Sequence, residues 1–273
     1  MNLKYYGTAA AEGIPAIFCR CETCQTARKL GGKNIRTRSQ VLVDGRLLID
    51  FPPDTYTHML YGGLELPDIT ALLVTHAHGD HLCAEDFLNR YPHMAHGVTA
   101  PLRVHGTAAV MENIRGKGVD NTDAIECHEI RAFEPFQVDD FTVTALTANH
   151  DPNSGPVIYI IGRGGKTMLY GNDTGWFPDE TWDYLARVKP AFDLLSLDCT
   201  GMDRANYRGY SHMSLYIDAE VRDRLAALGC AGPETICCAH HFSHNGGLDH
   251  DALVQAAAGY GFLVSYDGME IAF

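Results

Sequence analysis

The chain has 273 residues, enough for one large domain or two small ones. Apolar residues make up 46% of it and charged residues 20%, which indicates a globular protein with a sizeable core. The 34 acidic and 21 basic residues give a net charge of -13, which argues against a large nucleic acid as partner. No apolar run approaches the length of a membrane-spanning helix, so we expect no membrane contact.

The N-terminus and the cysteine count bear on the cell compartment. Residues 1–7 lack the basic and apolar regions of a secretory signal. The nine cysteines are an odd number, and without a signal they are more typical of thiols or metal ligands than of a disulfide framework. We therefore expect a cytoplasmic protein.

The predicted elements alternate along the chain without a linker, repeat or low-complexity tract. Runs rich in β-formers predict strands at Leu3–Tyr6, Gln40–Val43, Leu47–Asp50, Ile69–Val74, Leu102–His105, Phe141–Leu146, Val157–Gly162, Thr167–Tyr170, Leu194–Leu197, Thr235–Cys238, Phe262–Tyr266 and Glu270–Phe273. Helical patterns fall at Thr55–Tyr61, Ala84–Asn89, Ala108–Ile114, Asp179–Val188, Met213–Leu228 and Asp249–Ala258. This order predicts an α+β fold, with two β-layers packed on each other and helices outside, over a single domain of residues 1–273.

The most informative segment is residues 75–81, Thr-His-Ala-His-Gly-Asp-His, directly after an apolar run. Three imidazoles and a carboxylate at the mouth of a buried strand are costly to leave unpaired. Imidazole nitrogen and carboxylate oxygen are ligands that zinc, manganese and iron accept. The segment therefore predicts a divalent metal.

Three later positions repeat the pattern of a histidine or an acid just after a strand. They are His150, Asp173 and the adjacent pair His240 and His241. Because each lies where a predicted strand runs into a loop, all could meet with residues 76–81 on one edge of a sandwich. Neighbours on an extended segment face opposite sides, so only one of His240 and His241 should point inward.

These four elements, in this order, resemble the metallo-β-lactamase superfamily over nearly the whole chain. The resemblance implies a four-layer αβ/βα sandwich with a dinuclear site at one edge of the β-layers. It also implies the ligands: His76, His78 and His150 for the first metal, Asp80, His81 and His241 for the second, and Asp173 bridging both. His-Phe-Ser at 241–243 resembles the late motif of the superfamily, so His241 is the inward histidine and His240 packs nearby. Zinc, manganese and iron all suit this ligand set.

A second group of candidate ligands lies near the N-terminus. Cys19, Cys21 and Cys24 have nearly the spacing of zinc ligands but lack a fourth ligand nearby. The stretch from Gly7 to Cys24, the late Phe-Ser-His and the ending Ser-Tyr-Asp-Gly-Met-Glu-Ile resemble one subgroup, the PhnP-type phosphodiesterases of the carbon–phosphorus lyase pathway. That resemblance implies His244 as fourth ligand of a structural zinc in a loop at about 17–26. Free thiols in a loop are the alternative.

A proton donor is expected beside the metals. The phosphodiesterase branches imply that His212 lies near them and acts on the leaving group, a role that a histidine can fill. Asp198 could hold its other ring nitrogen, or could make only structural hydrogen bonds. A surface histidine at a helix start is the alternative for His212. We assign catalytic roles to Asp80, as a metal ligand, and to His212 and Asp198.

Other polar residues have weaker claims to a role. Arginine suits phosphate oxygens, so candidates for substrate contact comprise three arginines and three histidines: Arg103, Arg204, Arg208, His93, His96 and His105. A solvated side chain is the simpler interpretation of each. Asp50-Phe-Pro-Pro-Asp stands where many relatives have Asp, a small residue and Gly, which should reshape the cleft wall.

The subgroup resemblance implies a phosphodiesterase that hydrolyses small phosphodiesters, open or cyclic, and the metal site predicts a metal-bridging hydroxide as the nucleophile. The transfer-RNA-processing branch adds a long basic arm, but residues 150–173 leave room only for a short hairpin. Alternatives are a lactone or thioester hydrolase of the same fold, or a non-catalytic relative that binds a metabolite. The full ligand set favours catalysis. For the oligomeric state, both a monomer and a homodimer are left as alternatives.

Overall fold

The computed structural model describes residues 1–119, 121–205 and 211–273. Within these residues the strands form two seven-stranded mixed sheets. The first runs in the order β14 (Glu270–Ala272), β1 (Asn2–Gly7), β2 (Gln40–Val43), β3 (Leu47–Ile49), β4 (Ala71–Leu73), β5 (Leu102–Gly106) and β6 (Ile125–Glu129). The second runs in the order β13 (Leu263–Val264), β12 (Ile236–His240), β11 (Leu194–Asp198), β10 (Lys166–Gly171), β9 (Val157–Arg163), β8 (Phe141–Thr147) and β7 (Pro135–Val138).

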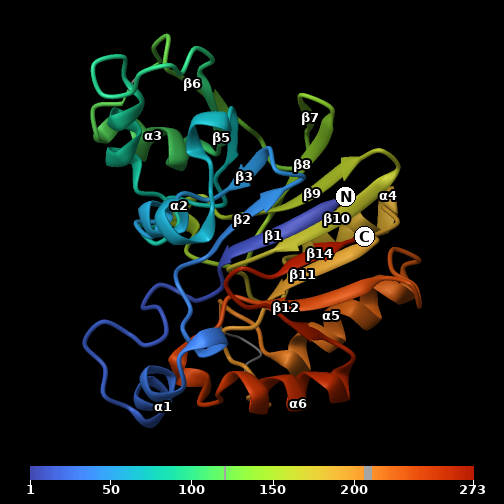
Figure 1. Ribbon diagram of the computed structural model, residues 1–273. Coiled ribbons are helices and arrows are strands. Elements are labelled where there is room, and N and C mark those ends of the chain that lie inside the picture. Colours follow the sequence, from blue (N-terminus) through green and yellow to red (C-terminus); the bar gives the residue numbers. More distant parts are fainter. Residues whose placement is uncertain (120, 206–210) are drawn as a thin grey trace.

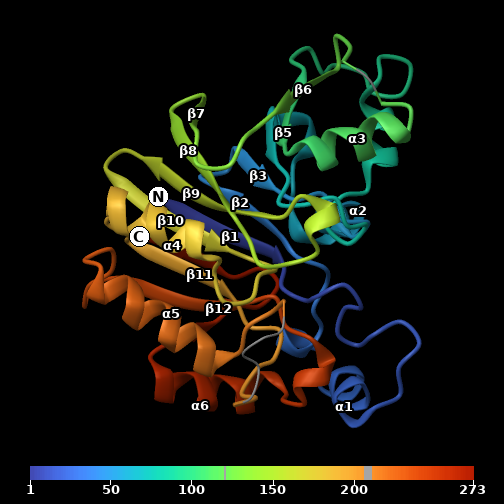
Figure 2. The same ribbon diagram turned by 180° about the vertical axis from the view of Figure 1, so that it is seen from behind.

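Helices cover the outer faces of the two sheets (Figures 1 and 2). These helices are α2 (Thr55–Gly62) and α3 (Ala108–Gly116) in the first half of the chain, and α4 (Asp179–Val188), α5 (Leu215–Ala227) and α6 (His250–Tyr260) in the second half. Helix α1 (Glu22–Leu30) lies beyond the end of the sheets, in contact with the 3-10 turn His244–Gly246. Short 3-10 turns lie at Gly32–Asn34, Leu66–Asp68, Ala84–Arg90, Pro152–Ser154 and His244–Gly246. Across the described residues, no helix combines the length and apolarity needed to cross a bilayer.

The buried apolar side chains show the layers directly. One cluster, with Tyr5, Val43, Val143 and Ile161, contains residues of both sheets and fills the space between them. A second cluster packs α3 and the 3-10 turn Ala84–Arg90 on the first sheet, and a third packs α4, α5 and α6 on the second sheet. Burial of apolar surface on both faces of each sheet is the main force that holds these layers together. The predicted four-layer αβ/βα sandwich is confirmed.

Most predicted elements are present, with shifted ends and three omissions. The predicted helix at 84–89 is a 3-10 turn, and the helix predicted from Met213 begins at Leu215, after Ser214. The omitted elements are α1, β6 and β7. The strands β6 and β7 are edge strands, and most of their side chains are partly or fully exposed, so their sequences carry little apolar signal.

Candidate metal centre

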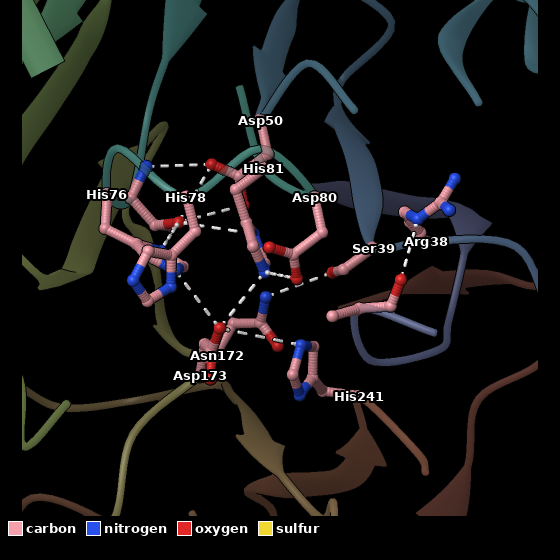
Figure 3. Close-up of polar contacts among 12 residues, drawn as sticks. Arg38, Ser39, Asp50, His76, His78, Asp80, His81, Asn172, Asp173 and His241 are labelled. Atoms are coloured by element: carbon pink, nitrogen blue, oxygen red, sulfur yellow. Dashed lines mark hydrogen bonds and ion pairs between the residues drawn. The ribbon is translucent and has the colours of Figure 1, made fainter. Parts of the chain in front are cut away.

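Strand ends from both sheets bring the predicted ligands together at one edge of the sandwich (Figure 3). The segment 75–81 follows β4, and His150 follows β8. Asp173 follows β10, and His241 follows β12. Asp50, Asp173 and His241 have positive φ angles of 65°, 50° and 61°. Such left-handed residues break the alternation of the strand and cluster at functional sites.

The predicted dinuclear ligands form two groups that share one carboxylate. Within each group the candidate ligand atoms all lie within 4.8 Å of one another. The first group is His76, His78, His150 and Asp173, and the second is Asp80, His81, Asp173 and His241. We call these seven residues the edge centre. Its arrangement has the shared aspartate that the resemblance implied, so the donor set suits two cations.

The ring nitrogens that face inward fit a cation better than a hydrogen-bond network. His81 Nε2 and His241 Nε2 are buried and make no hydrogen bond within the described residues. Yet His81 Nε2 lies 3.1 Å and His241 Nε2 3.7 Å from Asp173 Oδ2. Buried polar atoms are rarely left without a partner. A metal ion between nitrogen and carboxylate would satisfy both, which is the fit expected of ligand atoms.

The opposite nitrogens of the same rings are held by fixed partners. His81 Nδ1 donates to Asp50 Oδ2 at 2.7 Å, and His78 Nε2 donates to Asp151 Oδ2 at 3.3 Å. His241 Nδ1 lies 3.2 Å from Asp198 Oδ2 and 2.9 Å from Thr200 Oγ1. A proton held on the outer nitrogen leaves the lone pair of the inner nitrogen free for a metal. The protein thus sets the tautomer of each ring before an ion arrives.

His212 stands beside the edge centre, between two carboxylates. Its Nδ1 lies 3.1 Å from Asp173 Oδ1 and 3.2 Å from Asp198 Oδ2. Burial alone would lower the pKa of His212, but the charge of Asp198 and the hydrogen bond with Asp173 raise it to about 11. The ligand atoms of His212, Asp198, Asp173 and His241 also lie close enough to hold an ion. The raised pKa favours a proton at this position instead.

Charge balance among the buried groups follows from the same contacts. Burial would raise the pKa of Asp173, but the neighbouring rings of His241, His212, His76 and His81 hold it well below its ordinary value. Burial and the neighbouring His81 lower the pKa of His76 to about 4, so this ring is neutral at physiological pH. Burial likewise lowers the pKa of His150. An ionised carboxylate beside these two neutral imidazoles suits a divalent metal.

The cysteine loop forms a separate group, which we call the cysteine cluster. Ligand atoms of Cys19, Cys21, Cys24 and His244 lie within 4.8 Å of one another. The Sγ atoms of Cys19 and Cys21 are 3.6 and 3.3 Å from His244 Nδ1. The hydrogen bond from the Cys24 backbone and that with His244 lower the pKa of Cys21 to about 6, which favours the thiolate. The predicted set has the composition of a closed four-ligand zinc site.

The weaker candidates join neither group. His93 and His96 are exposed, and His105 stacks on His128 with ring centroids 4.7 Å apart. Arg103 pairs with Asp139, with both nitrogen–oxygen distances at 2.9 Å, and Arg204 is exposed. Arg208 lies outside the described residues. His240 packs beside the site, as predicted, with its Nε2 2.7 Å from Ser39 Oγ.

Sequence reasoning missed the residues that hold the ligands in place, Asp50, Asp151 and Thr200. It also missed Asn172, which donates to Ser39. Asp50 could have been found, because it is an acid at the end of a predicted strand, like Asp173. The others sit one or two residues from a predicted site residue, but no spacing rule marks them.

A metal-dependent hydrolase with the metallo-β-lactamase fold is the class that this fold and this site define. The chain belongs to the β-lactamase superfamily, since the family model described as "Beta-lactamase superfamily domain" matches residues 46–241. All seven residues of the edge centre lie within this matched range.

Three known proteins show how the similarity is distributed. Ribonuclease Z of Thermobifida fusca (strain YX) is 36% identical over 111 residues, which span 38% of this chain and 34% of that protein. A diphosphatase of the PhnP family is 21% identical, with a TM-score of 0.74, over 100% of this chain and 97% of that one. Zn(2+)-bound PqqB from Methylobacterium extorquens is 20% identical, with a TM-score of 0.75, over 100% of both. The chain thus matches only about a third of the ribonuclease, and the two structures show the fold.

Proposed function

We propose that the protein is a metal-dependent phosphodiesterase that hydrolyses small phosphodiesters, cyclic ones included. The observation that carries the proposal is the position of His212, whose Nδ1 lies 3.1 Å from Asp173 Oδ1 and 3.2 Å from Asp198 Oδ2. Hydrolysis of a phosphodiester releases an alkoxide, which needs a proton as it leaves. A positively charged histidine at the edge centre supplies that proton.

The metal assignment belongs to this proposal. His76, His78 and His150 would hold one ion, Asp80, His81 and His241 the other, and Asp173 both. When bound, two divalent ions (zinc, manganese or iron) would neutralise phosphoryl oxygens and lower the pKa of water. The cysteine cluster would hold a structural zinc, with no position left for substrate.

The protein's own groups then have distinct tasks. Asp198 accepts from His212 Nδ1 and keeps that ring charged, while Met213 N and Thr200 N donate to its other oxygen at 2.9 and 3.0 Å. Among the described residues, His212 Nε2 makes no hydrogen bond with protein, so its proton is available to a leaving oxygen. We therefore assign the donor proton to Nε2 and a positioning role to Asp198.

The similar proteins and the charge of the chain support this substrate class. A diphosphatase and a ribonuclease both act on phosphate linkages, as their names state. The net charge of -13 disfavours a long polyanionic RNA. Small phosphodiesters carry one charge each, and two cations at the site outweigh it.

The test is a substrate screen on protein loaded with zinc or manganese. We expect hydrolysis of bis(p-nitrophenyl) phosphate and of 2′,3′-cyclic nucleotides, and little turnover of thioesters or lactones. Activity on a thioester or lactone with none on either phosphodiester would overturn the proposal. Metabolite binding without turnover of any of the four would favour the non-catalytic alternative.

The variant His212→Ala tests the proton donor. We expect kcat to fall about 10²–10³-fold on cyclic nucleotides, because their alkoxide leaves without a proton. The loss should be smaller on bis(p-nitrophenyl) phosphate, whose phenolate is a weak base. His128→Ala, at an exposed position far from the edge centre in sequence and contacts, is the matched control. Equal losses on both substrates would disprove the donor role.

A further inference from the structure

A buried polar row lies directly behind the shared carboxylate of the edge centre. It begins at Asn172, the residue before Asp173, whose side chain is 1% exposed. Asn172 Nδ2 donates to Ser39 Oγ at 3.0 Å, and Ser39 Oγ lies 2.7 Å from His240 Nε2. His240 Nδ1 in turn lies 3.2 Å from Ser265 Oγ. The row therefore links the edge centre to the interior between the sheets.

The contact with Ser39 fixes which end of the Asn172 amide faces this row. Ser39 Oγ lies 3.0 Å from Asn172 Nδ2, 2.7 Å from His240 Nε2 and 3.2 Å from Tyr170 Oη. Asn172 Nδ2 donates to Ser39 Oγ, so the nitrogen of the amide is on the Ser39 side. The amide oxygen therefore points away from Ser39.

That amide oxygen is left without a partner. Asn172 Oδ1 is buried and makes no hydrogen bond within the described residues. Figure 3 shows the amide between Ser39 and His241, with its oxygen on the side of His241 and Asp173. Buried carbonyl oxygens are almost always hydrogen-bonded, so we expect a donor from outside the protein at Asn172 Oδ1. A water molecule in the edge centre would be such a donor.

We propose that Asn172 orients the attacking water: Oδ1 accepts one hydrogen bond from that water and directs its lone pair at the substrate. The inference rests on the proposed function only for the identity of the substrate. No covalent bond to Asn172 forms or breaks, and the residue keeps its protons throughout. Ser39 takes part by holding the amide in this orientation, so it is a positioning residue.

The decisive variants are Asn172→Leu, which keeps the volume but removes both polar atoms, and Asn172→Ala. We expect kcat to fall about 10–100-fold with KM changed less than about threefold, because a misdirected nucleophile slows the reaction without weakening substrate binding. Ser39→Ala should give a smaller loss in kcat, because Asn172 Oδ1 remains but its amide can rotate. Asn89→Ala, at an exposed position, is the matched control.

Two measurements without turnover separate this role from a structural one. Metal content per chain and calorimetric binding of inorganic phosphate should match wild type in Asn172→Leu. The urea midpoint of the metal-free protein should also stay near wild type. A variant that keeps wild-type kcat, or that loses metal or stability in proportion to activity, overturns the inference.

The experiment also distinguishes its own failure from that of the proposed function. The kcat comparison uses whichever ester the wild type hydrolyses in the screen above. If that ester is a lactone, the phosphodiesterase proposal fails, yet a selective loss of kcat in Asn172→Leu still supports the water-orienting role. If the wild type hydrolyses phosphodiesters but Asn172→Leu keeps the wild-type kcat, the water-orienting role fails and the proposed function stands.

Discussion

The edge centre and the cysteine cluster both gather side chains that a metal could join, but the chain holds them differently. In the edge centre, carboxylates and a threonine fix the outer nitrogens of the rings, as at His81 with Asp50. In the cysteine cluster, two thiols contact one ring, His244, and Cys21 is exposed. The fold thus organises the first site, whereas only a bound ion would complete the second.

Loss of the shared carboxylate should separate the two sites most strongly. In Asp173→Asn, both ions of the edge centre lose a charged ligand, whereas the cysteine cluster is untouched. We expect activity to fall about 10³-fold or more, the several kcal/mol that metal ions supply to a transition state. Metal analysis should show one tightly held zinc remaining. Retention of three metals would show that Asp173 is not the bridge.

The claim that the fold organises the edge centre can be tested at Asp50. Asp50→Asn keeps the shape but removes the charge that holds His81 Nδ1–H. We expect metal affinity at the second position to fall about 10–100-fold, as for other residues that orient metal ligands. Titration of the metal-free protein with zinc, followed by activity, measures it. Unchanged affinity would mean that His81 is oriented by packing alone.

The pH dependence should distinguish the edge centre through His212. Asp198 and Asp173 raise the pKa of His212 to about 11, although burial alone would lower it. The proton therefore stays bound through neutral pH and is lost as pH rises through that value. In Asp198→Asn one of the two charges is gone, and the alkaline fall of kcat/KM should move down by about one pH unit or more. A profile identical to wild type would assign the alkaline limb to another group.

The smallest effect on activity is expected from the cysteine cluster. Cys21→Ser should remove one zinc per chain and leave activity within about threefold of wild type. The thermal midpoint should fall by about 5 °C or more, since 1 kcal/mol corresponds to about 2–4 °C for a chain of this size. Calorimetry with metal analysis measures both. A loss of activity as large as that of Asp173→Asn would erase the distinction between the sites.

The sequence predicted the sandwich, and it predicted the residues that gather at its edge, because both depend on local rules. Buried strands appear as apolar runs, and ligands appear as histidine or acid at the ends of those runs. The helix α1 was missed because its sequence, ETCQTARKL, is short and polar, and because its Cys24 belongs to a cysteine-rich stretch that suggested a loop. Its start is nevertheless marked, since the side chain of Cys21 accepts a hydrogen bond from Cys24 N.

The partners of the ligands could not be predicted, because their roles arise from contacts between distant segments. Thr200 meets His241 across 41 residues, and Asp151 meets His78 across 73. Nothing in the local sequence distinguishes these side chains from solvated ones. Asn172 is the extreme case, since its role depends on a hydrogen bond to Ser39, 133 residues away.

The cysteine cluster also has a consequence for the chain as a polymer. Cys19 and His244 are 225 residues apart in sequence, so an ion held by both would act as a reversible cross-link around most of the protein. Closing so long a loop restricts the unfolded chain, and the restriction grows only slowly with loop length. Chelation would therefore reopen the tie between the two ends of the chain and increase the entropy gained on unfolding.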